Sequence, residues 1–144
     1  MGAMQRRKGH DFERDIARRL RARWPHLTVR RSQQGDKAYE PDVVVEGVPL
    51  WLECQCAAKP APLAKLEQAE RDVERFAERP HPIVVWRKSG ERTTRVTMAT
   101  GTLLETCGWS GWESSSPSEA HASVAVTLDF ELWLAAVNLE WVCR

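Results

Sequence analysis

The sequence lacks several features that would assign its 144 residues to a large functional class at once. No apolar run approaches the roughly 20 residues that a membrane-spanning helix requires. The N-terminus is basic and polar, without the apolar stretch of a secretory signal. Phosphate-loop, dinucleotide-binding and nucleophile-elbow fingerprints are missing too. We therefore expect a cytoplasmic protein that does not use a membrane.

Cysteine and histidine are scarce, with four residues of each. The cysteines show neither a CxxC pair nor the Cys/His spacing of a zinc site. We therefore expect free thiols, as in a reducing compartment. The histidines are scattered along the chain, and only His10 lies beside other candidate functional residues.

The length allows one domain with a substantial core, which we place at residues 5–144. Residues 1–4, Met-Gly-Ala-Met, resemble vector-derived residues ahead of a second methionine. Charge is distributed unevenly: residues 1–31 carry ten Lys and Arg against three acids, whereas the whole chain has a net charge of only +1. A basic end of this kind is typical of a protein with an anionic partner, and also of an ordinary solvated helix face.

Hydrophobic periodicity predicts an α/β fold with a mixed sheet. Apolar residues recur every four positions from Phe12 to Trp24, which predicts a first helix over residues 5–24. The other expected elements are strands at 27–32, 41–45 and 50–56, a helix at 63–78, strands at 83–86, 92–98 and 124–128, and a helix at 129–141 capped by Asp129.

A strand, helix and strand over residues 50–86 form a crossover unit, so these two strands should be parallel. The core of the domain is then residues 5–98, and we expect residues 100–123 to form an irregular excursion. Trp109 and Trp112 lie in this excursion, where they either pack or form a dimer contact, or stack on unpaired bases.

Two acids interrupt the apolar strands on either side of the Glu-Gly-Val-Pro turn at residues 46–49. If Val45 pairs with Leu50, Asp42 lies directly opposite Glu53, and both side chains point to the same face. Like charges in this arrangement are destabilising. A divalent cation, a raised pKa of one acid, or simple solvation at an open sheet end would each relieve the repulsion.

The first helix supplies a third acid, because Glu13 falls within the apolar arc of that helix. A buried, unpaired carboxylate is costly, so Glu13 either lies at the edge of the core or joins Asp42 and Glu53. Three acids with a divalent metal ion suit phosphodiester hydrolysis. Basic segments around residues 6–8, 18–23 and 30–31 would hold the phosphate backbone.

The chain resembles the PD-(D/E)XK nucleases, most closely the small archaeal-type and phage Holliday junction resolvases. The likeness covers roughly residues 5–98. It rests on Lys8-Gly9-x-x-Phe12-Glu13, Val29-Arg30-Arg31-Ser32, Pro41-Asp42, Leu52-Glu53-Cys54-Gln55, the helix containing Gln68 and the apolar strand after it. The resemblance implies a restriction-endonuclease-like core of order αβββαβ, with a mixed central sheet flanked by helices.

The resemblance also implies a site for Mg²⁺ or Mn²⁺. Asp42, Glu53 and the backbone carbonyl of Cys54 would bind the metal, and Glu13 would contact it directly or through water. Glu13, Asp42, Glu53 and Gln55 would be the catalytic residues. The expected DNA-binding residues are Arg6, Arg7, Lys8, Arg30, Arg31, Ser32, Lys37 and Lys59.

Gln55 departs from the family pattern, which usually has lysine at this position. Glutamine forms hydrogen bonds but carries no positive charge to orient a water or stabilise a phosphate. Three explanations remain open. Gln55 is a tolerated variant, or a lysine from elsewhere reaches the site, with Lys59 and Lys37 as the nearest candidates, or the activity is weakened.

The expected function is therefore a metal-dependent DNA endonuclease that resolves Holliday junctions or other branched DNA in recombination and repair. The resemblance implies a homodimer with one site in each subunit, acting in the cytoplasm, or in the host cytoplasm if the protein is phage-encoded. The alternatives are a less structure-selective nuclease of the same fold, and a catalytically weakened DNA-binding module.

Overall fold

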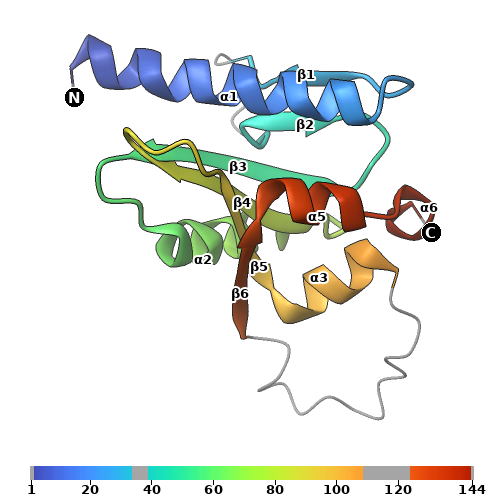
Figure 1. Ribbon diagram of the computed structural model, residues 1–144. Coiled ribbons are helices and arrows are strands. Elements are labelled where there is room, and N and C mark those ends of the chain that lie inside the picture. The colour runs from blue at the N-terminus through green and yellow to red at the C-terminus, as the bar shows by residue number, and fades with distance from the viewer. Residues whose placement is uncertain (1, 34–38, 109–123, 144) are drawn as a thin grey trace.

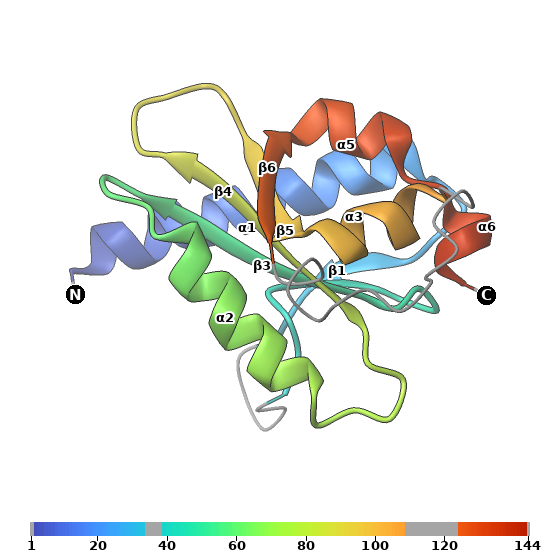
Figure 2. The same ribbon diagram turned by 90° about the horizontal axis from the view of Figure 1, so that it is seen from below.

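The computed structural model describes residues 2–33, 39–108 and 124–143. The described elements form an α/β fold around one six-stranded mixed sheet of order β1-β2-β3-β4-β5-β6. Helices α1 and α5 lie on one side of the sheet and α2 lies on the other (Figures 1 and 2). The expected α/β class and mixed sheet are confirmed.

The elements have the following bounds in chain order. They are α1 (Ala3–Arg23), β1 (Val29–Arg31), β2 (Val43–Val45), β3 (Leu50–Ala57), α2 (Pro62–Val73), β4 (His81–Lys88), β5 (Arg95–Ala99), α3 (Thr100–Cys107), β6 (Ala125–Asp129), α5 (Phe130–Ala136) and α6 (Leu139–Val142).

Strand pairing agrees with the crossover predicted for residues 50–86. β3 and β4 are parallel, with Leu50 opposite His81 at one end and Ala57 opposite Lys88 at the other. The other neighbouring pairs in the sheet are antiparallel. Because a parallel pair needs a long connection, α2 crosses over one face of the sheet between its two strands.

The register of the β2–β3 hairpin also agrees with the prediction. Val43 pairs with Leu52, which continues to Asp42 opposite Glu53. The turn contains Gly47 at a φ of +76°, a backbone conformation that glycine adopts without a steric penalty. Turn geometry therefore sets the two acids across from each other.

The main core lies between the sheet and the pair of helices α1 and α5. The predicted stripe of α1 is buried, with Phe12, Ile16 and Leu20 each at most 1% exposed. Their partners from the sheet and α5 include Leu52, Ile83, Val85, Val96, Met98, Phe130 and Trp133. This core fixes α1 across the strands that carry the candidate site.

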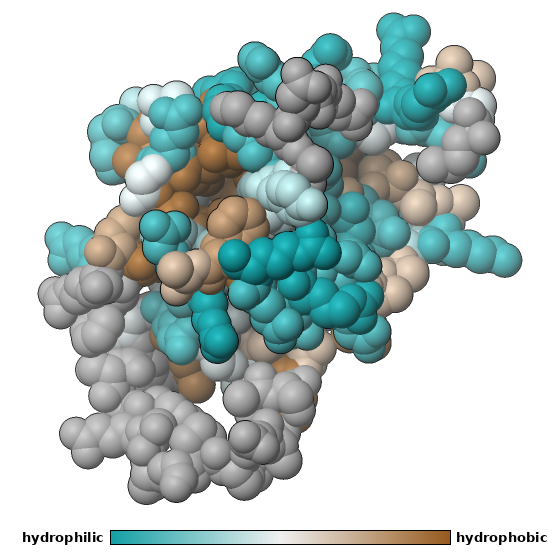
Figure 3. Space-filling model, turned by 180° about the vertical axis from the view of Figure 1, so that it is seen from behind, coloured by the Kyte–Doolittle hydropathy of each residue, from teal (hydrophilic) through white to brown (hydrophobic). Residues whose placement is uncertain are grey.

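A smaller apolar cluster lies under α2 on the opposite face. Trp51 of β3 packs against Ala69 and Val73 of α2, and its ring centroid is 5.3 Å from that of Phe76. Seen from the side opposite to Figure 1, hydrophilic residues cover much of the surface and a more apolar recess lies beside them (Figure 3). The Trp51 cluster fixes α2 against β3.

The expectation of an irregular excursion from residue 100 is wrong for its first part, because residues 100–107 form α3. Its sequence, TGTLLETC, has low helix propensity, which hid it. The buried Thr106 donates its hydroxyl hydrogen to the Thr102 carbonyl at 2.8 Å, and α3 packs on β4, β5 and α6. Gly108, at a φ of +69°, ends the helix in a way that the sequence does signal.

Several boundaries also differ from expectation. α1 begins at Ala3, α2 ends at Val73, and the last helix is divided into α5 and α6 around residues 137–138. Trp109 and Trp112 lie outside the described residues. None of the helices in the described part of the chain is both long and apolar enough to cross a membrane.

Asp129 caps α5 as the sequence predicts, and this cap can be tested. Its carboxylate accepts hydrogen bonds from the backbone N–H groups of Glu131 at 2.9 Å and Leu132 at 3.2 Å. We expect Asp129→Ala to lower the free energy of unfolding by about 1 kcal/mol, measured by urea denaturation. Asp129→Asn should retain most of this stability, because an amide oxygen also caps a helix. An equal loss in both variants would contradict the capping role.

Candidate functional site

The two acids of the β2–β3 hairpin are held in place by the strand that carries one of them. The backbone N–H of Cys54 donates to Asp42 Oδ2 at 2.8 Å. The indole N–H of Trp51, two residues from Glu53 on the same face of β3, donates to Glu53 Oε1 at 2.9 Å. Both carboxylates are thus oriented by donors, and Glu53 is the less exposed, with 16% of its side chain accessible.

A lysine from α2 lies between these acids. Lys65 Nζ is 3.1 Å from Glu53 Oε2 and 3.5 Å from Asp42 Oδ2. Lys65 lies in the first turn of α2, directly before the buried Leu66, so that the packing of α2 on the sheet also places the amine. One ammonium group therefore contacts both carboxylates and offsets their mutual repulsion.

The electrostatics of this cluster show how closely the three charges interact. Burial raises the pKa of Glu53, and the charge of Asp42 raises it further, against the opposing effects of Lys65 and the Trp51 hydrogen bond. Burial alone would lower the pKa of Lys65, but the charges of Asp42 and Glu53 outweigh it, so that this pKa is raised. Lys65 is therefore held in its charged form.

Lys65 is the residue that sequence reasoning missed. Of the two lysines considered instead, Lys59 is exposed in the turn before α2, and Lys37 lies outside the described residues. The available signal was the short Pro60-Ala61-Pro62 segment, which begins a helix so close to the end of β3 that its first turn must return over the strand. Spacing alone did not reveal which residue of that turn faces the acids.

Gln55 shares a face with Glu53, as predicted, but its amide is engaged elsewhere. Its Oε1 accepts a hydrogen bond from the backbone N–H of Ala61 at 2.9 Å. Ala61 immediately precedes α2. Gln55 therefore ties the end of β3 to the start of the helix that carries Lys65.

Glu13 does not join the pair formed by Asp42 and Glu53. Its Oε2 accepts hydrogen bonds from Arg31 Nε at 2.9 Å and from the Arg31 terminal nitrogen at 2.7 Å. Among the described residues, no three His, Cys, Asp or Glu side chains gather closely enough to hold a metal ion. Of the two positions that the sequence allowed for Glu13, the edge of the core agrees with the structure.

The charges of all three acids nevertheless act on one buried group, the Cys54 thiol. Burial raises the pKa of Cys54 well above its ordinary value, and the charges of Asp42, Glu13 and Glu53 each raise it further. The thiol therefore stays neutral. Glu13 thus lies near enough to act electrostatically on the strand residue between Glu53 and Gln55.

Asp42, Glu53 and Cys54 have donor atoms that suit a hard divalent cation, which prefers oxygen ligands. In a β-strand the N–H and C=O of one residue point to the same side. Because the Cys54 N–H points to Asp42, the Cys54 carbonyl also faces that side. Two carboxylates and this carbonyl would supply oxygen ligands, leaving the remaining positions to water and substrate.

Apart from Lys37, which lies outside the described residues, the residues predicted to bind DNA fall into two groups. Arg30 is paired with Glu40 at 2.8 Å and with Glu46 at 3.3 Å, and its pKa is raised, mainly by the hydrogen bond to Glu40. Arg31 is paired with Glu13, and the Ser32 hydroxyl donates to Glu40. The second group, Arg6, Arg7, Lys8 and Lys59, is exposed. Basic strand β1 is therefore largely neutralised within the protein.

Comparisons with known proteins give no relatives: no family model matches the chain, and neither a curated protein nor a solved structure matches it.

The raised pKa of Glu53 predicts a pH-dependent effect of Glu53→Gln in metal-free buffer. An acid with a raised pKa keeps its proton in the folded state after the unfolded chain has lost it, so that stability falls as pH rises through that window. Glutamine imitates the protonated form. We therefore expect the stability of Glu53→Gln relative to the unsubstituted protein to increase from pH 4 to pH 7, measured by urea denaturation in EDTA.

Glu67→Gln, a substitution at an exposed position of α2, provides the control for the same chemical change. A stability difference between Glu53→Gln and the unsubstituted protein that stays constant with pH, or that falls as pH rises, would show that Glu53 ionises at least as readily as in the unfolded chain.

Proposed function

We propose that the chain is a metal-dependent DNA endonuclease of the PD-(D/E)XK type, and that its preferred substrate is a four-way junction or other branched DNA. One observation supports this most strongly: Asp42 and Glu53 face each other across β2 and β3, and Lys65 contacts both. Two acids and a cation are the group that the motif requires, although the cation comes from a helix instead of the strand.

In the proposed mechanism, Asp42, Glu53 and the Cys54 carbonyl would hold Mg²⁺ or Mn²⁺. Such a metal would supply a water of lowered pKa and neutralise charge on the phosphate. Asp42 and Glu53 are kept in position by their donors, Cys54 N–H and Trp51 Nε1. The raised pKa of Lys65 keeps its amine charged, so that it can hold the phosphate or orient the water.

Gln55 then has a supporting role. Its hydrogen bond to Ala61 sets the start of α2, and Lys65 follows four residues after Ala61. The missing motif lysine is compatible with activity, because the positive charge reaches the acids from α2. This argument favours the enzyme over the catalytically weakened DNA-binding module.

The finer parts of the proposal concern the fold and the assembly. The described order of α1, β1, β2, β3, α2 and β4 is compatible with a restriction-endonuclease-like core. A homodimer would place two copies of the Asp42–Glu53–Lys65 cluster on the symmetric strands of a junction. Exposed Arg6, Arg7 and Lys8 at the start of α1 would contact the phosphate backbone.

A cleavage assay tests the proposal directly. The protein is incubated with a four-way junction, a linear duplex and single-stranded DNA, each in Mg²⁺, Mn²⁺ and EDTA. We expect paired symmetric nicks in the junction in the presence of a metal, and none in EDTA. Asp42→Asn should abolish cleavage, because it removes a charged metal ligand.

The other outcomes of this assay have separate meanings. Cutting of all three substrates would favour the less selective nuclease. Binding without cutting in either metal would contradict both enzyme proposals and leave the DNA-binding module. Cleavage that survives in Asp42→Asn would show that the site lies elsewhere.

Lys65 gives a second prediction, which concerns the source of the positive charge. We expect Lys65→Met to reduce the cleavage rate by about 100-fold, because one charged group is lost from the site. Lys88→Met, which removes an exposed lysine at the end of β4, should leave the rate nearly unchanged. The measurement is the single-turnover rate on whichever DNA the unsubstituted protein cuts.

The double variant separates a missing charge from a distorted site. Gln55→Lys alone should not raise the rate, since Lys65 already supplies the charge and the hydrogen bond to Ala61 is lost. Combined with Lys65→Met, Gln55→Lys should restore part of the activity by returning an amine to the motif position. Equal rates for Lys65→Met and the unsubstituted protein would refute the role given to Lys65.

A further inference from the structure

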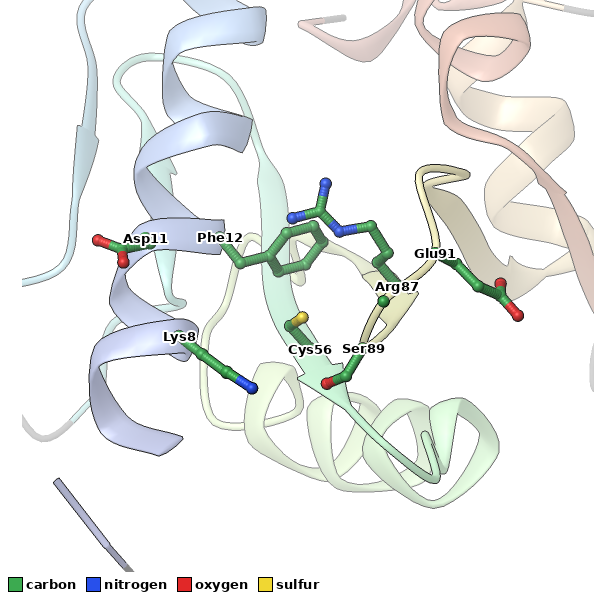
Figure 4. A pocket seen from close by; sticks show the side chains of 8 residues that line it. Lys8, Asp11, Phe12, Cys56, Arg87, Ser89 and Glu91 are labelled. Carbon is green, nitrogen blue, oxygen red and sulfur yellow. The ribbon is translucent and has the colours of Figure 1, made fainter. Parts of the chain in front are cut away.

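A pocket of about 260 Å³ lies on the α1 side of the sheet, away from Asp42 and Glu53. It is formed by α1, the end of β3 and the turn between β4 and β5 (Figure 4). Its lining residues are Lys8, Asp11, Phe12, Cys56, Arg87, Ser89, Gly90 and Glu91. The volume is several times the roughly 30 Å³ that a water molecule occupies in the liquid, which leaves room for a small hydrated anion.

The two acids that line this pocket are paired with arginines outside it, whereas its two cations have no acidic partner within the described ranges. Asp11 pairs with Arg14 at 3.3 Å and Glu91 pairs with Arg95 at 3.1 Å, so that both acids are engaged by arginines that do not line the pocket. Lys8 and Arg87, by contrast, have no acidic partner within 4.0 Å in the described part of the chain. Neither positive charge of the lining is therefore paired with an acid among the described residues, although two acids line the same pocket.

The directions of the side chains agree with this charge balance. The Lys8 amine and the Ser89 hydroxyl are directed toward a common space on one side of Cys56, and the Arg87 guanidinium lies over the Phe12 ring on the other side (Figure 4). The carboxylates of Asp11 and Glu91 are directed away from it. The open space is thus bordered by hydrogen-bond donors, which suit an anion.

Arg87 is held in a defined position in this lining. Its guanidinium carbon lies 4.8 Å from the centroid of the Phe12 ring, and Phe12 is only 1% exposed. Stacking on a buried ring fixes the plane of the guanidinium group, so that little side-chain entropy remains to be lost on binding. A fixed guanidinium fork is well suited to the oxygens of a phosphate.

The pocket is close to the candidate site along β3. Cys56 is three residues from Glu53, a distance of about 10 Å at roughly 3.3 Å per strand residue. The two side chains lie on opposite faces of the strand, because strand side chains alternate. A nucleic acid strand, with a phosphate at every nucleotide, could therefore reach both places around the end of β3.

We infer that this pocket binds phosphate of the backbone of the DNA engaged at Asp42 and Glu53, with Lys8 and Ser89 at one end of the pocket and Arg87 at the other. The inference that the ligand is a phosphate rests on the residues of the pocket alone. The assignment of the phosphate to DNA rests on the proposed function. Arg87 and Ser89 are thereby added to the DNA contacts, and Arg30 and Arg31, which are paired internally, contribute less.

Cys56 allows a direct test, because its thiol lies inside the pocket. Alkylation of Cys56 by iodoacetamide is followed by mass spectrometry in the Asp42→Asn protein, with the exposed Cys143 as internal reference. We expect a short DNA duplex to slow alkylation of Cys56 several-fold and to leave Cys143 unchanged. The same duplex should give no protection in Arg87→Gln.

Inorganic phosphate separates the two possible sources of the ligand. Protection of Cys56 by millimolar phosphate as well as by DNA supports the proposal. Protection by phosphate alone, with none from DNA, would overturn the assignment to DNA and leave a site for a small phosphate compound. Protection by neither would overturn the proposal as a whole.

Binding measurements give the matched comparison. In the Asp42→Asn background, Arg87→Gln and Lys8→Gln should each weaken DNA binding about tenfold, as expected for loss of a charge-assisted hydrogen bond. Each should also lower, by about one, the number of phosphate contacts obtained from the salt dependence of the DNA affinity. Lys88→Gln, at an exposed position of the same strand outside the pocket, should change the affinity less than twofold.

Folding and function are controlled separately. Circular dichroism checks that Arg87→Gln is folded. Arg87→Lys keeps the charge but not the planar fork, so that its affinity for DNA should lie between those of Arg87→Gln and the Asp42→Asn protein. Equal affinity of Arg87→Gln and Lys88→Gln for DNA would overturn phosphate binding in the pocket, even if the protein is a nuclease. Protection of Cys56 by DNA, without cleavage in either metal, would overturn the proposed nuclease activity and support phosphate binding in the pocket.

Discussion

The contact of Lys65 with Asp42 and Glu53 is the constraint on which the candidate site depends. The hairpin places two carboxylates on one face, and without a cation they repel each other in a half-buried position. The cation comes from a helix that reaches this position only through the crossover from β3 to β4. The packing of Trp51 against α2 and the hydrogen bond from Ala61 to Gln55 both fix that helix. Formation of the site is therefore coupled to docking of α2 on the sheet.

Much of this arrangement could be predicted, because it follows from local rules. The turn at residues 46–49 sets the register, and strand alternation then determines that Asp42 and Glu53 share a face. The crossover predicts that β3 and β4 are parallel, and the apolar spacing on α1 predicts which of its residues are buried. These conclusions need no knowledge of how distant segments meet.

The unpredicted features all depend on tertiary contacts. Lys65 was missed because its role depends on how α2 lies over the sheet. Glu13 was correctly placed within the buried arc, but the sequence did not show that Arg31 would be its partner. α3 was missed because the burial of Thr102 and Thr106 outweighs the weak helix propensity of that segment. In each case a partner from another element decides the outcome.

The same reasoning changes the meaning of the basic N-terminal segment. A count of charges alone, with ten cations in residues 1–31, indicates a strongly positive surface. In the structure, five of the arginines, namely Arg14, Arg18, Arg19, Arg30 and Arg31, are paired with acids.

An ion pair within the protein must be broken or shared before its arginine can contact a phosphate, which reduces the net gain from binding. Attraction of an anionic partner would therefore depend less on the number of arginines than on the cations without acidic partners. Of these, Lys8 lies on α1 and Arg87 lies far away in the sequence on β4. The fold brings both to the lining of one pocket, so that cations from two separate segments lie at the same opening.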